Sequence, residues 1–310
     1  MKPTVTIATI AYNEEANIAL FVKSVLQQRT DNFKLAKFLI VSDGSTDKTV
    51  GIAKSFKSKK IQLIAHPKRE GKSKRLNQIF RSLKSDYLVM FDADVILKNK
   101  DTIINLINAF KNDNKIGLVG GNPQPFPGRN LIERGVNCSF RVYDKLRVLG
   151  YWAYGCDGRI LAMTKQFAKS ITIPSDMIAN DAYMYFAAKT KGFRFVHVRN
   201  AIVIYRSPST IRDQIRQNTR FIAAHYRLEK IFGPIVQQEY KMPNGFYAKE
   251  SFKEFTRHPL DAASLFLINI ICRIKARITE QKLTAIWDIA KTTKQVKTKY
   301  QIIDIVYNSK

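Results

Sequence analysis

The sequence contains little cysteine: Cys138, Cys156 and Cys272 are the three among 310 residues. Three cysteines cannot pair completely, and their spacing does not match a zinc ribbon. This scarcity excludes a small protein held together by disulfides. We therefore expect reduced thiols and a cytoplasmic location.

Long apolar runs are also lacking. Met1–Ile10 has one lysine and then a strand-like alternation, without the apolar core and small-residue cleavage site of a signal peptide. No stretch reaches the ~18 apolar residues that span a bilayer, and the longest candidate, Ala262–Cys272, is interrupted by Asn269. Internal repeats and low-complexity blocks are absent as well, which excludes a repeat array.

Acidic residues are scarce, with 25 Asp and Glu against 52 Lys and Arg and a net charge of +27. The excess is +17 over residues 1–200 and +10 over residues 201–310, so it is not confined to a tail. It suggests a phosphorylated substrate, an anionic membrane surface or nucleic acid, although a lysine-rich proteome gives the same excess. We expect no nucleic-acid partner, because the chain has no helix-turn-helix, finger or aromatic RNA platform.

The first part of the chain alternates short apolar runs with helical patterns. We expect strands at Val5–Ile10, Phe38–Val41, Ile61–Ile64, Tyr87–Phe91 and Ile116–Val119. Helices are expected at Glu14–Gln28, Thr46–Phe56, Lys72–Leu83 and Asp101–Phe110. This alternation predicts an α/β fold with a mostly parallel, doubly wound sheet.

After Pro127 the alternation is less regular. Helices are expected at Leu131–Leu149, at Asn180–Lys191 before Gly192, and at Ser209–Phe232, and strands at Arg159–Met163, Phe193–Val198 and Ile202–Tyr205. We expect a catalytic domain over residues 1–235 and a basic amphipathic helical extension over residues 236–310.

A polar cluster follows each of four expected strands. The clusters are Ala11–Glu15, Ser42–Asp47, Glu70–Lys72 and Asp92–Asp94. Ligands of doubly wound sheets lie beyond the carboxyl ends of the strands, so we expect all four clusters at one edge. That edge offers carboxylates for a divalent cation, a lysine for phosphate, and acceptors for a base or ribose.

Asp92 and Asp94 are two carboxylates separated by one residue after a buried strand. Such a pair can hold a hard cation, which neutralises the charge on a leaving phosphate. An Asx-turn or a helix cap is the structural alternative. A helix cap at Ser45 would likewise explain Gly44 and Ser45 but not Asp43. A lysine at a helix start, as at Lys72, is unfavourable and therefore favours a role facing phosphate.

These stretches resemble the family 2 glycosyltransferases of the GT-A fold. The matching segments are T-I-A-Y-N-E-E, V-S-D-G-S-T-D-K-T, E-G-K-S-K-R-L-N and F-D-A-D, in the family's order. Further on, Gly155–Arg159 resembles the glycine-rich acceptor-side loop, Asn180-Asp181 the E-D pair, and Gln217-x-x-Arg220-Phe221 the Q-x-x-R-W motif. The resemblance covers roughly residues 4–232.

The resemblance implies a role for each matching position. On the donor side, it implies that the nucleoside is held by Ala11, Tyr12, Glu14 and Asp43, and that Lys72 and Asp92 flank the ribose and phosphates. Asp94, with Asp92 as a second candidate, would bind Mn²⁺ or Mg²⁺. Asp181 would be the general base of an inverting displacement. The acceptor or diphosphate side would comprise Gly155, Asp157, Asn180, Gln217, Arg220 and Phe221.

Three positions depart from the family pattern. Ser42 stands in place of a second Asp, Asn180 in place of Glu, and Phe221 in place of Trp. An aromatic ring that can stack on a sugar is kept at Phe221. Gln217 and Arg220 share a helix face that reaches the cleft or, alternatively, is a solvated face of a basic helix.

The C-terminal part combines apolar and basic residues. Pro259–Ile278 has a broad apolar face, Leu283–Ala290 contains Trp287, and lysines follow at positions 291, 294, 297 and 299. A basic amphipathic helix with Trp at its edge is typical of a membrane interface. The alternative is that these helices pack on the catalytic domain. We therefore expect either packing or peripheral attachment to the inner face of the cell membrane.

Together with the resemblance, the residues imply a metal-dependent inverting glycosyltransferase. Its donor would be a UDP-sugar first, or a GDP- or dTDP-sugar. Its acceptor would be a glycan or polyprenyl-linked hydroxyl in cell-surface polysaccharide or glycolipid synthesis. A polyprenyl-phosphate sugar transferase is the nearest alternative. A sugar-nucleotide nucleotidyltransferase would need a glycine-rich loop where Tyr12–Glu15 stands, and a nucleic-acid-binding module is the alternative from another class.

Overall fold

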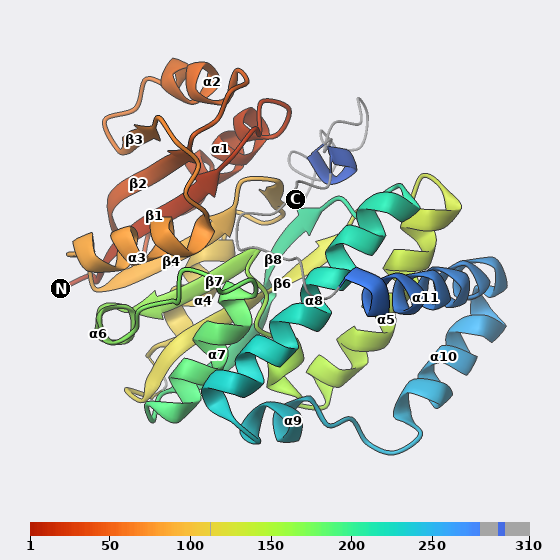
Figure 1. Cartoon of the computed structure of the whole chain (residues 1–310). Helices are drawn as coiled ribbons and strands as arrows, with labels where there is room; N and C mark the ends of the chain where they lie inside the picture. The colour runs from red at the N-terminus through yellow and green to blue at the C-terminus, as the bar shows by residue number, and fades with distance from the viewer. Residues whose placement is uncertain (112, 280–290, 295–310) are drawn as a thin grey trace.

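The computed structural model describes residues 1–111, 113–279 and 291–294 (Figure 1). Leu283–Ala290 and the lysines at positions 297 and 299 lie outside these residues. The described chain forms an eight-stranded sheet of order β3-β2-β1-β4-β7-β6-β8-β5. The strands are β1 (Thr4–Ala11), β2 (Lys34–Asp43), β3 (Ile61–His66), β4 (Tyr87–Asp92), β5 (Val95–Leu97), β6 (Ile116–Pro125), β7 (Ile160–Thr164) and β8 (Arg194–Tyr205).

The N-terminal half of the sheet is parallel, as the sequence predicts. Strands β3, β2, β1 and β4 all run the same way, so their carboxyl ends meet at one edge. Strand β7 runs antiparallel to both β4 and β6, and β5 runs antiparallel to β8. The β6–β8 pair is parallel. The result is a mixed sheet whose parallel half carries the four polar clusters.

Helices cover both faces of this sheet, which explains why its strands are apolar on both sides. One face packs against α1 (Ile18–Leu26), α2 (Thr49–Ser55) and α4 (Thr102–Ala109) in a core that includes Phe21, Phe38 and Leu106. The other packs against α3 (Lys72–Ser82), α6 (Lys165–Ser170) and α7 (Asn180–Thr190) in a core that includes Phe80, Phe167 and Phe186.

The remaining helices gather beside the β6–β8 part of the sheet, away from β1–β3 (Figure 1). They are α5 (Leu131–Val148), η1 (Trp152–Tyr154), α8 (Ile211–Phe232), α9 (Ile235–Tyr240), α10 (Phe246–Arg257) and α11 (Pro259–Thr279), and a short turn η3 (Lys291–Lys294) follows. Helix α11 packs on α5 and α8. None of the helices within the described residues is both long and apolar enough to cross a lipid bilayer.

Two helices begin later than the sequence pattern predicts. Asn13 has a left-handed φ of 54°, and the carbonyl of Glu14 accepts bonds from the N–H groups of Asn17 and Ile18, so a turn precedes α1. The cap expected near Ser45 or Thr46 is wrong, because α2 starts at Thr49, whose N–H donates to the Asp47 carboxylate at 3.0 Å. The Ser45 hydroxyl instead accepts a bond from the N–H of Asn13, 3.2 Å away, and joins the two loops.

The strand assignments differ at the far end of the sheet. The two strands expected at Phe193–Val198 and Ile202–Tyr205 are one strand, β8, whose pairing with β6 is shifted between Gly120 and Asn122. The three-residue strand β5 was not predicted. Its position follows from pairing with the end of β8 rather than from its own short sequence.

A buried ion pair joins the end of β2 to α3. The guanidinium of Arg75 and the carboxylate of Asp43 lie 2.7 Å apart, with side chains that are 1% and 4% exposed. Arg75 also donates to the carbonyl of Lys68 at 2.9 Å. Asp43 accepts bonds from the N–H groups of Glu70 and Gly71, at 3.0 and 2.8 Å. Both charges are therefore satisfied inside the fold.

Replacing Arg75 with Met should lower the free energy of unfolding by about 3–5 kcal/mol, because it leaves a buried carboxylate without its counter-charge. Urea unfolding followed by circular dichroism measures the change. The matched control is Lys74→Met, on the same helix with a half-exposed side chain, which should change stability by about 1 kcal/mol or less. Equal losses in the two variants would contradict the importance of the buried pair.

Candidate active site

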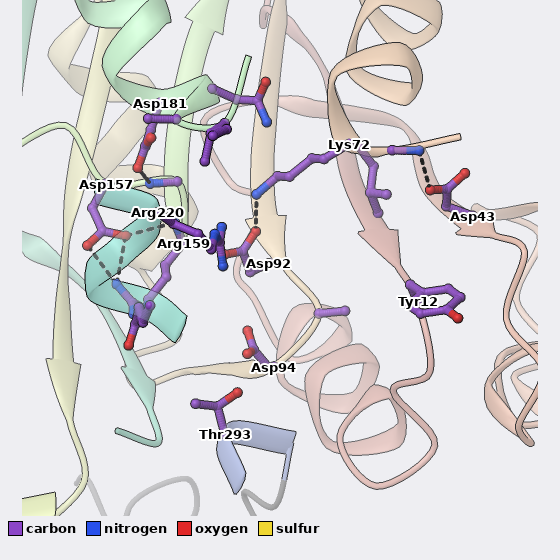
Figure 2. A pocket seen from close by; sticks show the side chains of 18 of the residues that line it. Tyr12, Asp43, Lys72, Asp92, Asp94, Asp157, Arg159, Asp181, Arg220 and Thr293 are labelled. Carbon is purple, nitrogen blue, oxygen red and sulfur yellow. Dashed lines mark hydrogen bonds and ion pairs between the residues drawn. The ribbon is translucent and has the colours of Figure 1, made fainter. Parts of the chain in front are cut away.

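A cavity of about 280 Å³ opens at the carboxyl ends of the parallel strands (Figure 2). All four polar clusters contribute to it. Of the residues singled out in the sequence, its walls include Tyr12, Glu14, Asp43, Lys72, Asp92, Asp94, Asp157, Asn180, Asp181, Gln217, Arg220 and Phe221. Two others do not line it. Ala11 is fully buried in the core beside α1, and Gly155 ends η1 against the ring of His197.

Tyr12 and Glu14 form one end of the cavity, on the loop after β1. The guanidinium of Arg69 lies 4.0 Å from the centre of the Tyr12 ring, in a cation–π contact. Glu14 is 8% exposed and accepts a bond from the side-chain amide of Asn17 at 2.9 Å. This end therefore presents an aromatic ring backed by positive charge.

Lys72 and Asp92 meet in the middle of the cavity, where Figure 2 shows the ammonium group pointing at the carboxylate. Their charged atoms are 2.5 Å apart, and each side chain is about 30% exposed. Partial burial lowers the pKa of Lys72. The charge and hydrogen bond of Asp92, with the charges of Asp181 and Asp94, outweigh that effect and raise it above the usual value. Lys72 is therefore a fixed positive charge among three carboxylates.

Asp94 lines the cavity beyond Asp92, on the side that faces Thr293 of η3 (Figure 2). Within residues 1–111, 113–279 and 291–294, no cluster of three or more His, Cys, Asp and Glu side chains could hold a metal unaided. Carboxylate oxygens are ligands that Mg²⁺ and Mn²⁺ accept, and Mg²⁺ is usually bound by one or two carboxylates plus substrate phosphates. The donor set at Asp92 and Asp94 therefore fits a cation shared with a diphosphate.

Asp181, in the first turn of α7, is held by two backbone groups. Its carboxylate accepts bonds from the N–H of Gly158 at 3.0 Å and the N–H of Ala182 at 2.9 Å. Burial and the negative charge of Asp157 raise its pKa, while Lys72 and the two N–H groups lower it. The net result is a pKa above the usual value for Asp. Asp181 is thus an oriented carboxylate with an increased affinity for a proton.

Asp157 and Arg159 form an ion pair on the other side of Asp181, with charged atoms 2.8 Å apart. Burial raises the pKa of Asp157, but the charge and hydrogen bonds of Arg159 lower it more, so this carboxylate stays ionised. Arg159 also lies over the ring of Tyr205, 3.9 Å from its centre. Asp157 and Asp181 are therefore neighbouring carboxylates with opposite pKa shifts.

Helix α8 faces the cavity with Gln217, Arg220 and Phe221, so the alternative of a fully solvated face is wrong. Burial lowers the pKa of Arg220 to about 10, against the charges of Asp181 and Asp92. Phe221 remains 60% exposed. The three-residue spacing of Gln217 and Arg220 placed both side chains on one helix face, and that face lines the cavity.

Four arginines that line the cavity were not among the predicted site residues: Arg69, Arg159, Arg206 and Arg216. Two of them had a signal, because Arg69 immediately precedes the Glu70–Lys72 cluster and Arg159 ends the Gly155–Arg159 loop. Arg206 and Arg216 lie after β8 and on α8, and only the packing of those elements brings them here.

A second cavity of about 610 Å³ adjoins the first. The two share the side chains of Asp157, Arg159, Ala179, Asp181, Gln217 and Phe221. Asp181 therefore faces two spaces, one at the carboxyl ends of the strands and one among the C-terminal helices.

Comparison with known proteins gives relatives among the glycosyltransferases. The family model described as Glycosyl transferase family 2 matches residues 6–171. A poly-beta-1,6-N-acetyl-D-glucosamine synthase of Staphylococcus aureus is 24% identical over 223 residues, covering 70% of this chain and 53% of the relative. A 4,4'-diaponeurosporenoate glycosyltransferase of S. aureus is 30% identical over 160 residues, covering 50% of this chain and 40% of the relative.

Solved structures share the fold. A mannosyltransferase from Pyrobaculum calidifontis, in complex with GDP-Man and Mn²⁺, has a TM-score of 0.62 and 16% identity, covering 100% of this chain and 89% of its own. Glucosyl-3-phosphoglycerate synthase from Mycobacterium tuberculosis, in complex with Mn²⁺, UDP and glucosyl-3-phosphoglycerate, has a TM-score of 0.53 and 16% identity, covering 74% of this chain and 80% of its own.

These likenesses agree with the GT-A architecture that the sequence predicted. The chain spans about half the length of the S. aureus synthase that it matches. The matched segment runs from β1 through α6 and includes Asp43, Asp92 and Asp94. On this evidence, the chain belongs to glycosyltransferase family 2.

Proposed function

We propose that this protein transfers a sugar from a nucleoside-diphosphate sugar to an acceptor hydroxyl, with inversion at the anomeric carbon. The observation that carries the proposal is the position of Asp181. An oriented carboxylate with a raised pKa lies at the junction of two cavities, one of which gathers the carboxylates and cations that suit a nucleotide diphosphate.

The donor would occupy the cavity at the strand ends. Tyr12, Glu14 and Asp43 would face the nucleoside, with Ala11 shaping the strand behind them. Lys72 and Asp92 would flank the ribose and phosphates, and Arg220 would add positive charge near the diphosphate. Asp94, with Asp92, would hold the divalent cation, which when bound supplies charge neutralisation for the diphosphate. UDP is the first donor nucleotide to test, with GDP and dTDP as alternatives.

The acceptor hydroxyl would approach Asp181 from the other side. Its proton would pass to the carboxylate as the oxygen attacks the anomeric carbon, and the bond to the diphosphate would break on the opposite face of the sugar. A base poised in this way contributes about 10²–10⁴-fold to the rate. Asn180 would support this side of the site, because it accepts a bond from the Ser73 hydroxyl at 2.8 Å and is next to Asp181. Gly155 would contribute by starting the loop that carries Asp157.

We also propose that the protein docks on an anionic membrane through the outer faces of α10 and α11. Phe266, Leu267, Ile270 and Ile274 lie on one side of α11, and Phe252 and Phe255 on α10, with exposed fractions from 40% to 68%. Apolar surface of this kind marks interaction sites. Lys249, Lys253 and Arg257 of α10 are exposed beside the phenylalanines, which suits anionic lipid.

Two substitutions should separate the donor and base roles. Asp94→Asn should abolish Mn²⁺-dependent binding of UDP in calorimetric titration, because it removes the cation's ligand. Asp181→Asn should keep UDP affinity and lower the transfer rate by about 10²–10⁴-fold. The matched control is Asp176→Asn, an exposed position close in sequence to the base and outside both cavities. Normal transfer by Asp181→Asn would refute the base assignment.

The charge of Lys72 should set the acidic limit of activity. Asp181 must be ionised to act as a base, so kcat/KM should fall as pH drops through its raised pKa. Lys72 lowers that pKa, so Lys72→Met should raise it further and move the acidic limb of the pH profile to higher pH. Lys74→Met, a solvent-exposed neighbour, should leave the limb in place. A limb that stays fixed in Lys72→Met would contradict this coupling.

Membrane docking predicts co-sedimentation with phosphatidylglycerol-containing vesicles, weakened by 0.5 M salt because charge contributes. The double variant Phe266→Ser/Leu267→Ser should bind about tenfold more weakly or worse, because it loses two apolar side chains from the interface. Leu26→Ser, at an exposed leucine on α1, is the control. Equal binding by all three proteins, or dimerisation through this face instead, would refute the membrane proposal.

A further inference from the structure

A short turn from the C-terminal part of the chain lines one side of the cavity at the strand ends, the donor cavity. The turn η3 follows α11 in the sequence, yet Figure 1 shows it near the start of α8 and apart from α10 and α11. Thr293 of η3 lines the donor cavity, and Figure 2 shows its side chain on the same side as Asp94. The sequence motifs end with Phe221, so none of them predicted a contribution from this segment.

Thr292 anchors η3 to the start of α8. The N–H and the hydroxyl of Thr292 both donate to the carboxylate of Asp213, at 3.0 and 2.7 Å. The same hydroxyl accepts a bond from the N–H of Ser209 at 3.2 Å. Thr292 is therefore held by three hydrogen bonds to residues 209–213, which fixes the position of its neighbour Thr293.

The partner of this anchor, Asp213, is a buried carboxylate. It is 4% exposed, and burying a carboxylate without hydrogen bonds is unfavourable. Among the described residues, Thr292 supplies both hydrogen bonds that this carboxylate accepts, and the guanidinium of Arg216 lies 3.6 Å away. Arg216 itself lines the donor cavity. Because buried polar groups are normally satisfied, this pairing indicates a specific docking position for η3 rather than an incidental contact.

We propose that η3 is a wall of the donor cavity, in which the hydroxyl of Thr293 binds the diphosphate of the nucleotide sugar and Thr292 is the residue that positions it. The inference rests on the proposed transfer reaction and extends it to a segment outside the catalytic motifs. A threonine hydroxyl donates one hydrogen bond and carries no charge. It therefore suits a phosphate oxygen near Asp94, where a further lysine would repel the cation.

The wall also limits the access of water to this side of the cavity. Attraction between charged groups is stronger where water is excluded, so a docked η3 strengthens the binding of a diphosphate and its cation. Loss of the anchor should therefore weaken the nucleotide, even though Thr292 does not itself line the cavity.

The test is calorimetric titration with UDP in the presence of Mn²⁺. Thr293→Val keeps the shape of the side chain and removes its hydroxyl, so it should bind UDP about tenfold more weakly. Thr292→Val should weaken UDP about five- to tenfold through loss of the anchor, whereas Thr292→Ser keeps the hydroxyl and should bind as the unmodified protein does. The matched control is Thr256→Val, at an exposed threonine of α10 outside both cavities, which should leave the affinity unchanged.

Hydrogen exchange followed by mass spectrometry reports the docking of η3 without any nucleotide. The backbone of residues 291–294 should exchange faster in Thr292→Val than in the unmodified protein or in Thr292→Ser, because the anchor on Asp213 is weakened. Equal exchange in the three proteins overturns the role of Thr292, and circular dichroism checks that each variant is folded.

Unchanged UDP affinity in either valine variant overturns the inference. Tighter binding of UDP does so too, because it would mean that η3 obstructs the nucleotide. Both results leave the proposed transfer reaction intact, since the unmodified protein then binds UDP with Mn²⁺. If UDP, GDP and dTDP all fail to bind the unmodified protein, the proposed transfer reaction fails and this inference fails with it.

Discussion

The buried ion pair between Arg75 and Asp43 is the constraint on which the site depends. Asp43 ends β2, and its carboxylate holds the N–H groups of Glu70 and Gly71, so the start of α3 is tied to the end of the strand. Two side chains in the first turn of α3 then contact different parts of the site. Lys72 pairs with Asp92 at the end of β4, and Ser73 donates to Asn180 beside Asp181. One buried pair thus fixes the spacing between the donor side and the candidate base.

The cavity at the strand ends is balanced in charge, although the chain as a whole is strongly basic. The chain carries +27 overall, yet the cavity at the strand ends is lined by six acidic and six basic side chains. A diphosphate with its cation needs both signs, because phosphate oxygens attract Lys and Arg while the cation attracts carboxylates. Two neighbouring carboxyl groups also differ in pKa. Arg159 lowers the pKa of Asp157 and keeps it ionised, whereas burial and the charge of Asp157 raise the pKa of Asp181.

The sequence was informative wherever a feature is local. A buried strand followed by a polar cluster located β1, β2 and β4 and the residues that meet at their ends. The sequence-based predictions failed where contacts between distant segments determine the secondary structure. Strand β5 exists only because β8 lies beside it, and the start of α1 is delayed by the left-handed Asn13 and the link from Ser45. Motifs pointed to Gln217 and Phe221 at the inner rim of the second cavity. The rest of its walls had no sequence signal, because α5, α8 and α11 form them only by packing together.

Helix α11 separates the second cavity from the surface that is proposed to dock on lipid. Its inner face brings Leu265, Asn269 and Cys272 to the second cavity, and its outer face exposes Phe266, Leu267 and Ile270. An α-helix with side chains is about 10–12 Å across, so an acceptor cavity on one side of α11 lies within that distance of whatever covers the other. An acceptor group in this cavity and a lipid tail in a membrane under α11 are therefore close enough to belong to one molecule. Transfer to a lipid-linked acceptor and docking on lipid are compatible because one helix, apolar on two faces, separates them.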